Sequence, residues 1–231
     1  MKIKKTISLI LPLTTILLIA TSCSSKKVKL EQLKPPSKGE EIVVMKTNYG
    51  DIKIRLFPKV APKAVENFKT QIKRGYYDGK TFYRTKKDYF IQGGSNGDIL
   101  RDSIWGKYYE DEFDKDYIHI RGSLCNANLG EPDTNGSAFF IVQNKKVEED
   151  LVDTMNDLVD EGAYSKDIAN AYKQLGGVPD YDMKYTVFGQ VYEGMNTVDK
   201  IANVEVDESD KPKKEVVIES AKIEKYKEYK K

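Results

Sequence analysis

The chain is poor in the residues from which most metal and redox sites are built. Its 231 residues include two cysteines, one histidine and one tryptophan. The single histidine, His119, excludes a histidine-rich metal centre, and Cys23 and Cys125 allow one disulfide at most. The acidic runs at 110–112 and 148–150 lack the ligand spacing of a calcium loop, so solvated loops and helix starts explain them better. We therefore expect neither a metal ion nor a cofactor.

A long apolar run occurs only at the N-terminus. Lys2, Lys4 and Lys5 precede the run ISLILPLTTILLIA, and small polar residues follow it. This order of charged, apolar and small residues predicts a secretory signal peptide over residues 1–22. Because the run is short and contains Pro12, it is not expected to span a membrane.

An excess of one charge is also missing. The formal net charge is +2, and residues 1–22 carry three lysines and no acid, so without them the charge becomes 2 − 3 = −1. A nearly neutral chain has no electrostatic reason to bind nucleic acid.

The residues Ala20-Thr21-Ser22-Cys23 resemble the lipobox of bacterial lipoproteins, in which the cysteine receives a diacylglyceryl group. The resemblance implies a lipid anchor at Cys23 and a place in the cell envelope, on the periplasmic or outer surface of a bacterial membrane. The alternative is an ordinary secretory signal with a cysteine nearby. Residues 23–40 are polar, contain Pro35-Pro36 and lack apolar periodicity, which predicts a flexible tether.

The folded domain is expected over residues 41–225. Two strand patterns around the turn signal at 48–51 predict a β-hairpin. A helix is expected from Pro62 to just before Gly75, because proline suits the first turn and glycine the end. A second helix is expected over 195–202, and further short strands at 81–83, 122–124, 138–142, 185–188 and 216–218. This pattern predicts a mainly β fold, a closed antiparallel β-barrel capped by two helices.

One region departs from the β pattern. Within residues 146–178, apolar residues recur at helical spacing in two runs, and Ser165 is a suitable N-cap for the second run. We interpret the region as a helical hairpin inserted between two strands. The lysine-rich end KIEKYKEYKK is expected to be solvated, with residues 226–231 as a charged tail.

Two segments carry residues that a plain barrel wall would not need. They are FYRTKKDYFIQGG at 82–94 and GSLCNANLGEPDTNGSAFFI at 122–141. Together with the later strand Thr186-Val187-Phe188-Gly189, they resemble the cyclophilin family in the order of its motifs. The resemblance covers residues 42–224. It implies a cyclophilin-like barrel and a peptidyl-prolyl cis/trans isomerase that assists the folding of exported proteins.

The resemblance also implies where a proline-containing segment would bind. Arg84 is the expected catalytic residue. The expected substrate-binding residues are Tyr89, Phe90, Gln92, Cys125, Asn126, Ala127, Phe140, Tyr181 and Tyr185. Residues 85–88 and Ala138 depart from the family pattern and predict a remodelled rim.

An arginine suits this reaction for a physical reason. Rotation about the prolyl bond breaks amide resonance, which costs about 18–20 kcal/mol. As resonance is lost, the proline nitrogen becomes pyramidal and gains a lone pair. A guanidinium aimed at that nitrogen binds the twisted state better than either planar state, and this difference lowers the barrier.

Other interpretations stay open at this point. Phe90 and Phe140 could be core residues only, as Phe82, Phe139 and Phe188 are expected to be in any case. Cys125 is better explained by small-residue packing than as a nucleophile, because no histidine accompanies it. The function could instead be that of a catalytically weak proline-binding module or envelope chaperone. A structural lipoprotein whose helical hairpin is the working surface is a third possibility.

Overall fold

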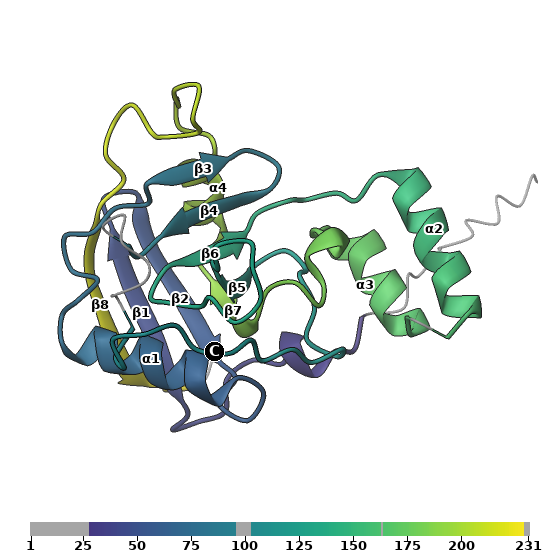
Figure 1. Ribbon diagram of the computed structural model, residues 1–231, viewed down its shortest axis with the longest axis horizontal. Helices are drawn as coiled ribbons and strands as arrows, with labels where there is room; N and C mark the ends of the chain where they lie inside the picture. The colour runs from purple at the N-terminus through teal and green to yellow at the C-terminus, as the bar shows by residue number, and fades with distance from the viewer. Residues whose placement is uncertain (1–27, 96–102, 163, 229–231) are drawn as a thin grey trace, which may run out of the picture.

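The computed structural model describes residues 28–95, 103–162 and 164–228 (Figure 1). The predicted signal peptide and Cys23 lie outside these residues. Among the described helices, none is both long and apolar enough to cross a bilayer.

Eight antiparallel strands form one curled sheet in the order β3-β4-β6-β5-β7-β2-β1-β8. The strands are β1 (Glu41–Thr47), β2 (Gly50–Leu56), β3 (Arg84–Lys86), β4 (Phe90–Gly93), β5 (Ser123–Asn126), β6 (Phe139–Val142), β7 (Val187–Glu193) and β8 (Ile218–Lys225). The outer strands β3 and β8 do not pair directly. Instead, the residues before them meet through a bridge between Thr81 and Val217 and a 2.9 Å bond from Phe82 N to Val216 O. The expected closed barrel is therefore approximate, because its seam is a short bridge.

Helices α1 (Pro62–Lys73) and α4 (Met195–Ala202) are the two predicted caps. Their apolar faces pack into the barrel core, where Phe68 of α1 and Val198 of α4 are almost completely buried. Pro62 occupies the first turn of α1 as expected. The carboxylate of Glu112 accepts hydrogen bonds from the free N–H groups of Lys63 and Ala64, both at 3.0 Å. An acidic loop thus satisfies the start of the helix.

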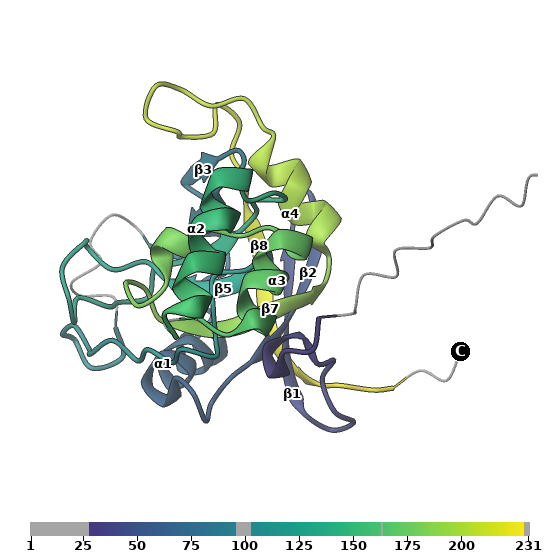
Figure 2. The ribbon, with the colours of Figure 1, turned by 90° about the vertical axis from the view of Figure 1, so that its right-hand side faces the viewer.

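The helical hairpin is confirmed as α2 (Glu149–Asp160) and α3 (Lys166–Leu175). It projects from one side of the sheet, at the right of Figure 1, and its two helices pack against each other (Figure 2). Ser165 caps α3 by accepting a 3.2 Å hydrogen bond from the N–H of Ile168. After α3, a 3₁₀ turn η2 (Pro179–Tyr181) leads into β7.

The prediction of a flexible tether over 23–40 is wrong for its described part. A second 3₁₀ turn, η1 (Glu31–Leu33), carries Gln32 into the interior, where the side chain is completely buried. Its amide donates to Ile118 O and Ser123 Oγ, each at 2.9 Å, and accepts from Ile118 N at 2.9 Å. A cluster of buried apolar residues, here called the hairpin cluster, joins the helical hairpin to the segment before β5; it includes Ile118, Met155 and Tyr172. It is also contacted by Val28, Leu30 and Leu33. A few well-placed contacts order a segment that has no periodic pattern.

Two strand predictions also need correction. The strand expected at 81–83 is a single bridge at Thr81, and the paired strand β3 begins at Arg84. The first residues of the lysine-rich end, 222–225, are not solvated tail but the last part of β8. They pair with β1 from Val44 to Glu41, so the backbone is hydrogen-bonded although Lys222 and Lys225 are exposed.

Candidate active site

The sheet brings the predicted arginine, glutamine and phenylalanines together through strand register. Arg84 of β3 lies opposite Gln92 of β4, which in turn lies opposite Phe140 of β6. Because alternate residues of a strand share a face, Phe90 joins Gln92 on this side. The intervening Ile91 points into the barrel core.

A loop supplies the facing wall. Tyr181 ends η2, and Tyr185 follows shortly after. Their rings lie 5.0 Å apart, centroid to centroid, and lie 5.8 and 5.3 Å from the ring of Phe140 in edge-to-face arrangements. Burial raises the pKa of Tyr181 to about 12, so its phenol is neutral at physiological pH. Three aromatic rings from different elements therefore meet at one place.

Between these walls lies a pocket of about 130 Å³. Its volume is below the roughly 300–1,000 Å³ of drug-sized ligand sites, so it suits one small side chain or ring. The residues that line it are Arg84, Phe90, Gln92, Ala127, Asn128, Phe140, Tyr181 and Tyr185. Phe90 and Phe140 are thus both packed and part of a pocket wall, rather than core residues only.

Arg84 lies at the edge of this pocket. Its side chain is 44% exposed, and its guanidinium carbon lies 5.2 Å from the centroid of the Phe90 ring. One guanidinium nitrogen forms an ion pair with Asp210 at 3.2 Å. Asp210 belongs to the loop between α4 and β8. The charge of Arg84 is therefore partly exposed and has a carboxylate partner.

Gln92 was expected to bind the substrate, but without substrate its side-chain amide bonds to a neighbouring tyrosine. Its Nε2 donates a 2.7 Å hydrogen bond to the phenol oxygen of Tyr83. Burial raises the pKa of Tyr83, although the bond from Gln92 and the charge of Arg84 act in the opposite direction. The bond holds the Gln92 side chain beside the pocket.

Two predicted substrate-binding side chains do not reach the pocket. Cys125 is fully buried beside Phe140, its cross-strand partner, and burial together with the charge of Asp182 raises the pKa of its thiol well above the ordinary range. Asn126 is 2% exposed and its Oδ1 accepts a 3.2 Å hydrogen bond from Tyr109. As consecutive residues of β5 they point to opposite faces of the sheet, Cys125 toward the side of Phe140 and Asn126 toward the side of Phe139, and neither lines the pocket.

The rim differs from expectation in three places. Tyr89 is 41% exposed and lies outside the pocket, with the Lys86 ammonium 4.5 Å from its ring. Ala138 is 1% exposed and packs beneath the aromatic residues, so its side chain is not part of the rim. Asn128 lines the pocket without having been predicted, although it directly follows the Cys125-Asn126-Ala127 motif.

Comparisons with known proteins agree with this geometry. The family model for cyclophilin-type peptidyl-prolyl cis-trans isomerases matches residues 42–223. Proteins of Staphylococcus aureus and Staphylococcus epidermidis, provisionally named peptidyl-prolyl cis-trans isomerases, are each 46% identical over 193 and 196 residues. These matches cover 83% and 84% of this chain and 95% and 97% of the relatives.

Solved structures are similar over the same region. The crystal structure of a cyclophilin-type peptidyl-prolyl cis-trans isomerase from Cryptosporidium parvum has a TM-score of 0.63 and 30% identity, covering 81% of this chain and 99% of that one. A second structure of that protein, in the presence of the dipeptide Ala-Pro, has a TM-score of 0.62 and 29% identity. The chain belongs to the cyclophilin-type peptidyl-prolyl isomerase family.

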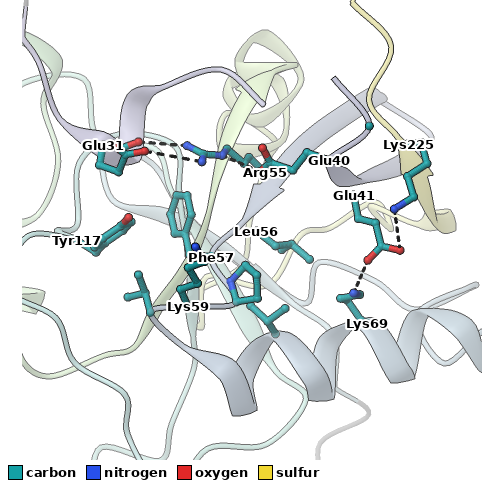
Figure 3. A pocket seen from close by; sticks show the side chains of 14 residues that line it. Glu31, Glu40, Glu41, Arg55, Leu56, Phe57, Lys59, Lys69, Tyr117 and Lys225 are labelled. Atoms are coloured by element: carbon teal, nitrogen blue, oxygen red, sulfur yellow. Dashed lines mark hydrogen bonds and ion pairs between the residues drawn. The ribbon is translucent and has the colours of Figure 1, made fainter. Parts of the chain in front are cut away.

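The protein also has a larger pocket, of about 760 Å³, which shares no lining residue with the pocket beside Arg84 (Figure 3). It lies between η1, the end of β2 and the start of α1. Most of its charged side chains pair with one another: Arg55 with Glu40 at 2.8 Å, and Glu41 with Lys69 and Lys225. Because most of these charges are paired, and because none of the predicted site residues lines this pocket, size alone does not mark the candidate active site.

Proposed function

We propose that the pocket beside Arg84 binds the proline ring of an X-Pro segment and accelerates its cis/trans rotation in exported proteins. The observation that carries the proposal is the position of the guanidinium, at the edge of a side-chain-sized pocket lined by four aromatic residues. Aromatic walls hold the ring and exclude water while the rest of the peptide turns.

In this proposal Arg84 is the catalytic residue. Its guanidinium donates a hydrogen bond to the proline nitrogen as amide resonance disappears, and therefore favours the twisted state. The Gln92 amide and the backbone around Asn126, Ala127 and Asn128 hold the peptide main chain on the other side of the bond. No bond to the substrate is made or broken, so the proline-containing segment is the only partner that the chemistry requires.

The cellular setting is proposed from the N-terminal residues. A lipid at Cys23 would attach the domain to the outer surface or periplasmic face of a bacterial membrane. Because Val28 already packs against the hairpin cluster, only residues 24–27 separate the anchor from the folded domain. At about 3.3–3.6 Å per residue, this leaves the domain within roughly 17 Å of the anchor. The domain would then work close to the membrane surface.

The test is a protease-free isomerisation assay, by exchange NMR on an Ala-Pro peptide, with the chain from Ser24 onwards. This start keeps Gln32 and its buried hydrogen bonds. Arg84→Ala should lower kcat/KM about 100-fold or more, the order found when one transition-state donor is removed. Arg74→Ala, an exposed arginine at the end of α1, is the matched control and should match the wild type.

A proline-binding module with little catalysis is the second candidate. The ion pair with Asp210 favours it, because that carboxylate competes for the Arg84 guanidinium. If the wild type bound the Ala-Pro peptide but gave the uncatalysed exchange rate, this second function would replace the first. Equal activity of the wild type and Arg84→Ala would refute only the role of Arg84.

A further inference from the structure

One carboxylate connects the helical hairpin to the proline groove. Asp182 lies in the loop between Tyr181 and Tyr185. Its Oδ1 accepts a hydrogen bond from the backbone N–H of His119 at 3.0 Å, and the His119 ring Nδ1 lies 2.8 Å from the same oxygen. Asp182 therefore joins the loop to the segment that precedes β5.

Two tyrosines of the insertion complete this contact. The Tyr172 hydroxyl of α3 lies 2.7 Å from both carboxylate oxygens of Asp182, and the Tyr164 hydroxyl donates to Oδ2 at 3.0 Å. The side chains of Asp182 and His119 are 10% and 1% exposed. A buried carboxylate is costly unless it is hydrogen-bonded, so these donors determine where the loop can lie.

The phenols remain donors over the physiological pH range. Burial first, and then the negative charge of Asp182, raise the pKa of both Tyr164 and Tyr172. Tyr172 is also completely buried among Ile118, Ile120 and Met155. The hairpin thus offers one hydroxyl group from α3 and one from the turn that precedes α3.

From Asp182 the contacts continue to the groove wall. The His119 ring stacks on Phe140, with centroids 6.3 Å apart and planes 15° apart. The same ring meets Tyr181 at 6.0 Å and Tyr185 at 6.3 Å in edge-to-face contacts. Asp182 thereby holds both the loop between the two wall tyrosines and the imidazole behind Phe140.

We propose that the helical insertion is a positioning device for the proline groove. Asp182, Tyr164 and Tyr172 are positioning residues: they act through Tyr181, Tyr185 and His119, and do not touch the substrate. The proposal rests on the proposed function of the groove. It gives the hairpin a role within the domain, in contrast to a hairpin that serves only as a surface for partners.

Tyr164→Phe is the sharpest test, because it removes one hydroxyl and leaves the ring in place. Ser165→Ala is the matched control in the neighbouring residue. It removes the cap of α3 and lowers the stability of the hairpin without touching Asp182. Both variants are made in the chain from Ser24, and their unfolding in denaturant is measured beside kcat and KM.

Tyr164→Phe should lower kcat/KM about 10-fold, since a misplacement of 1 Å can cost up to about 100-fold. Ser165→Ala should keep the wild-type value while it is folded. In the Asp182→Asn background, Tyr164→Phe should have little further effect, because both act through one carboxylate. Wild-type kinetics of folded Tyr164→Phe, or an equal loss in Ser165→Ala, would refute the proposal.

An NMR measurement keeps this test separate from the proposed function. Tyr164→Phe should shift the ring resonances of Tyr181 and Tyr185 in the free protein, and Ser165→Ala should leave them unchanged. This result is expected even if the wild type fails to catalyse, in which case the proposed function alone would be refuted. Unshifted resonances in Tyr164→Phe would overturn the positioning role.

Discussion

The two walls of the proline groove are held in place by different means. Arg84, Phe90, Gln92 and Phe140 are placed by the backbone ladder of β3, β4 and β6. The facing tyrosines lie on a loop whose position depends on side-chain contacts to the helical insertion. A wall built on a strand ladder tolerates most side-chain changes nearby, whereas a wall held by a few side chains can be displaced by one substitution.

The largest effect is expected at Gly177, where the chain returns from the insertion to the loop wall. Its φ is +137°, and a Cβ there would lie 2.4 Å from the carbonyl oxygen of His119. Gly177→Ala should destabilise the protein by about 3 kcal/mol or more, as expected for a clash at a strained backbone position. Denaturant unfolding measures this loss.

Gly162→Ala is the matched control for that change. Gly162 also belongs to the insertion and has a φ of +83°, but nothing lies within 4 Å of its Cβ position. It should cost about 1–2 kcal/mol, the cost of a left-handed conformation. If the two variants lost the same free energy of unfolding, Gly177 would not be closely packed against His119.

An intermediate effect is expected at Asp199, which ties α4 to the segment before β5 and to the start of the insertion. Asp199 accepts hydrogen bonds from Arg121 at 2.8 and 2.9 Å and from Gln143 at 2.9 Å, and Lys145 lies 2.9 Å away. Asp199→Asn should destabilise the protein at neutral pH by about 2 kcal/mol, because hydrogen bonds to a charged group are lost.

The same residue predicts a dependence on pH. Burial raises the pKa of Asp199, but hydrogen bonds from Gln143, Lys145 and Arg121 outweigh it and lower the pKa below its ordinary 3.8. The stabilisation is therefore full above about pH 3.8 and is lost as the pH falls through the lower folded value. The wild type and Asp199→Asn should therefore become more similar in their free energy of unfolding as the pH falls below about 3.8. Asp153→Asn, at an exposed position of α2, should show no such narrowing.

The smallest effect is expected at Asp210, the partner of Arg84. Because the ion pair is exposed, it should contribute about 0–1 kcal/mol. Asp210→Asn should therefore change kcat/KM by less than about 5-fold, and added salt should reproduce the change in the wild type. A loss as large as that of Arg84→Ala would mean that the ion pair, rather than the strand ladder, positions the arginine.

Much of the fold can be predicted because its signals are local. The hairpin of β1 and β2, the start of α1 at Pro62 and the cap of α3 at Ser165 follow from residues close together in the chain. The motifs around Arg84 and Phe140 identify the sheet wall for the same reason. Each motif lies on a strand, and strand pairing turns sequence order into proximity.

The features that were predicted wrongly or missed depend on residues that are far apart in the chain. Gln32 looks like part of a tether because it is polar and without periodicity, yet its partners are more than 80 residues away. Cys125 was expected to bind the substrate, but it is completely buried beside Phe140. Asp210 has no local signal at all, since its contact with Arg84 spans 126 residues.

The family, most of the strands, the four α-helices, and the arginine and phenylalanines of one pocket wall can be predicted from the amino-acid sequence. These depend on periodicity, caps and motifs that are read over a few neighbouring residues. Which polar side chains are buried depends on the folded chain: Gln32 bonds to Ile118 and Ser123, and Asp182 lies among His119, Tyr164 and Tyr172. Burial of a polar group is favourable only when distant donors and acceptors meet it, and only the folded chain brings them together.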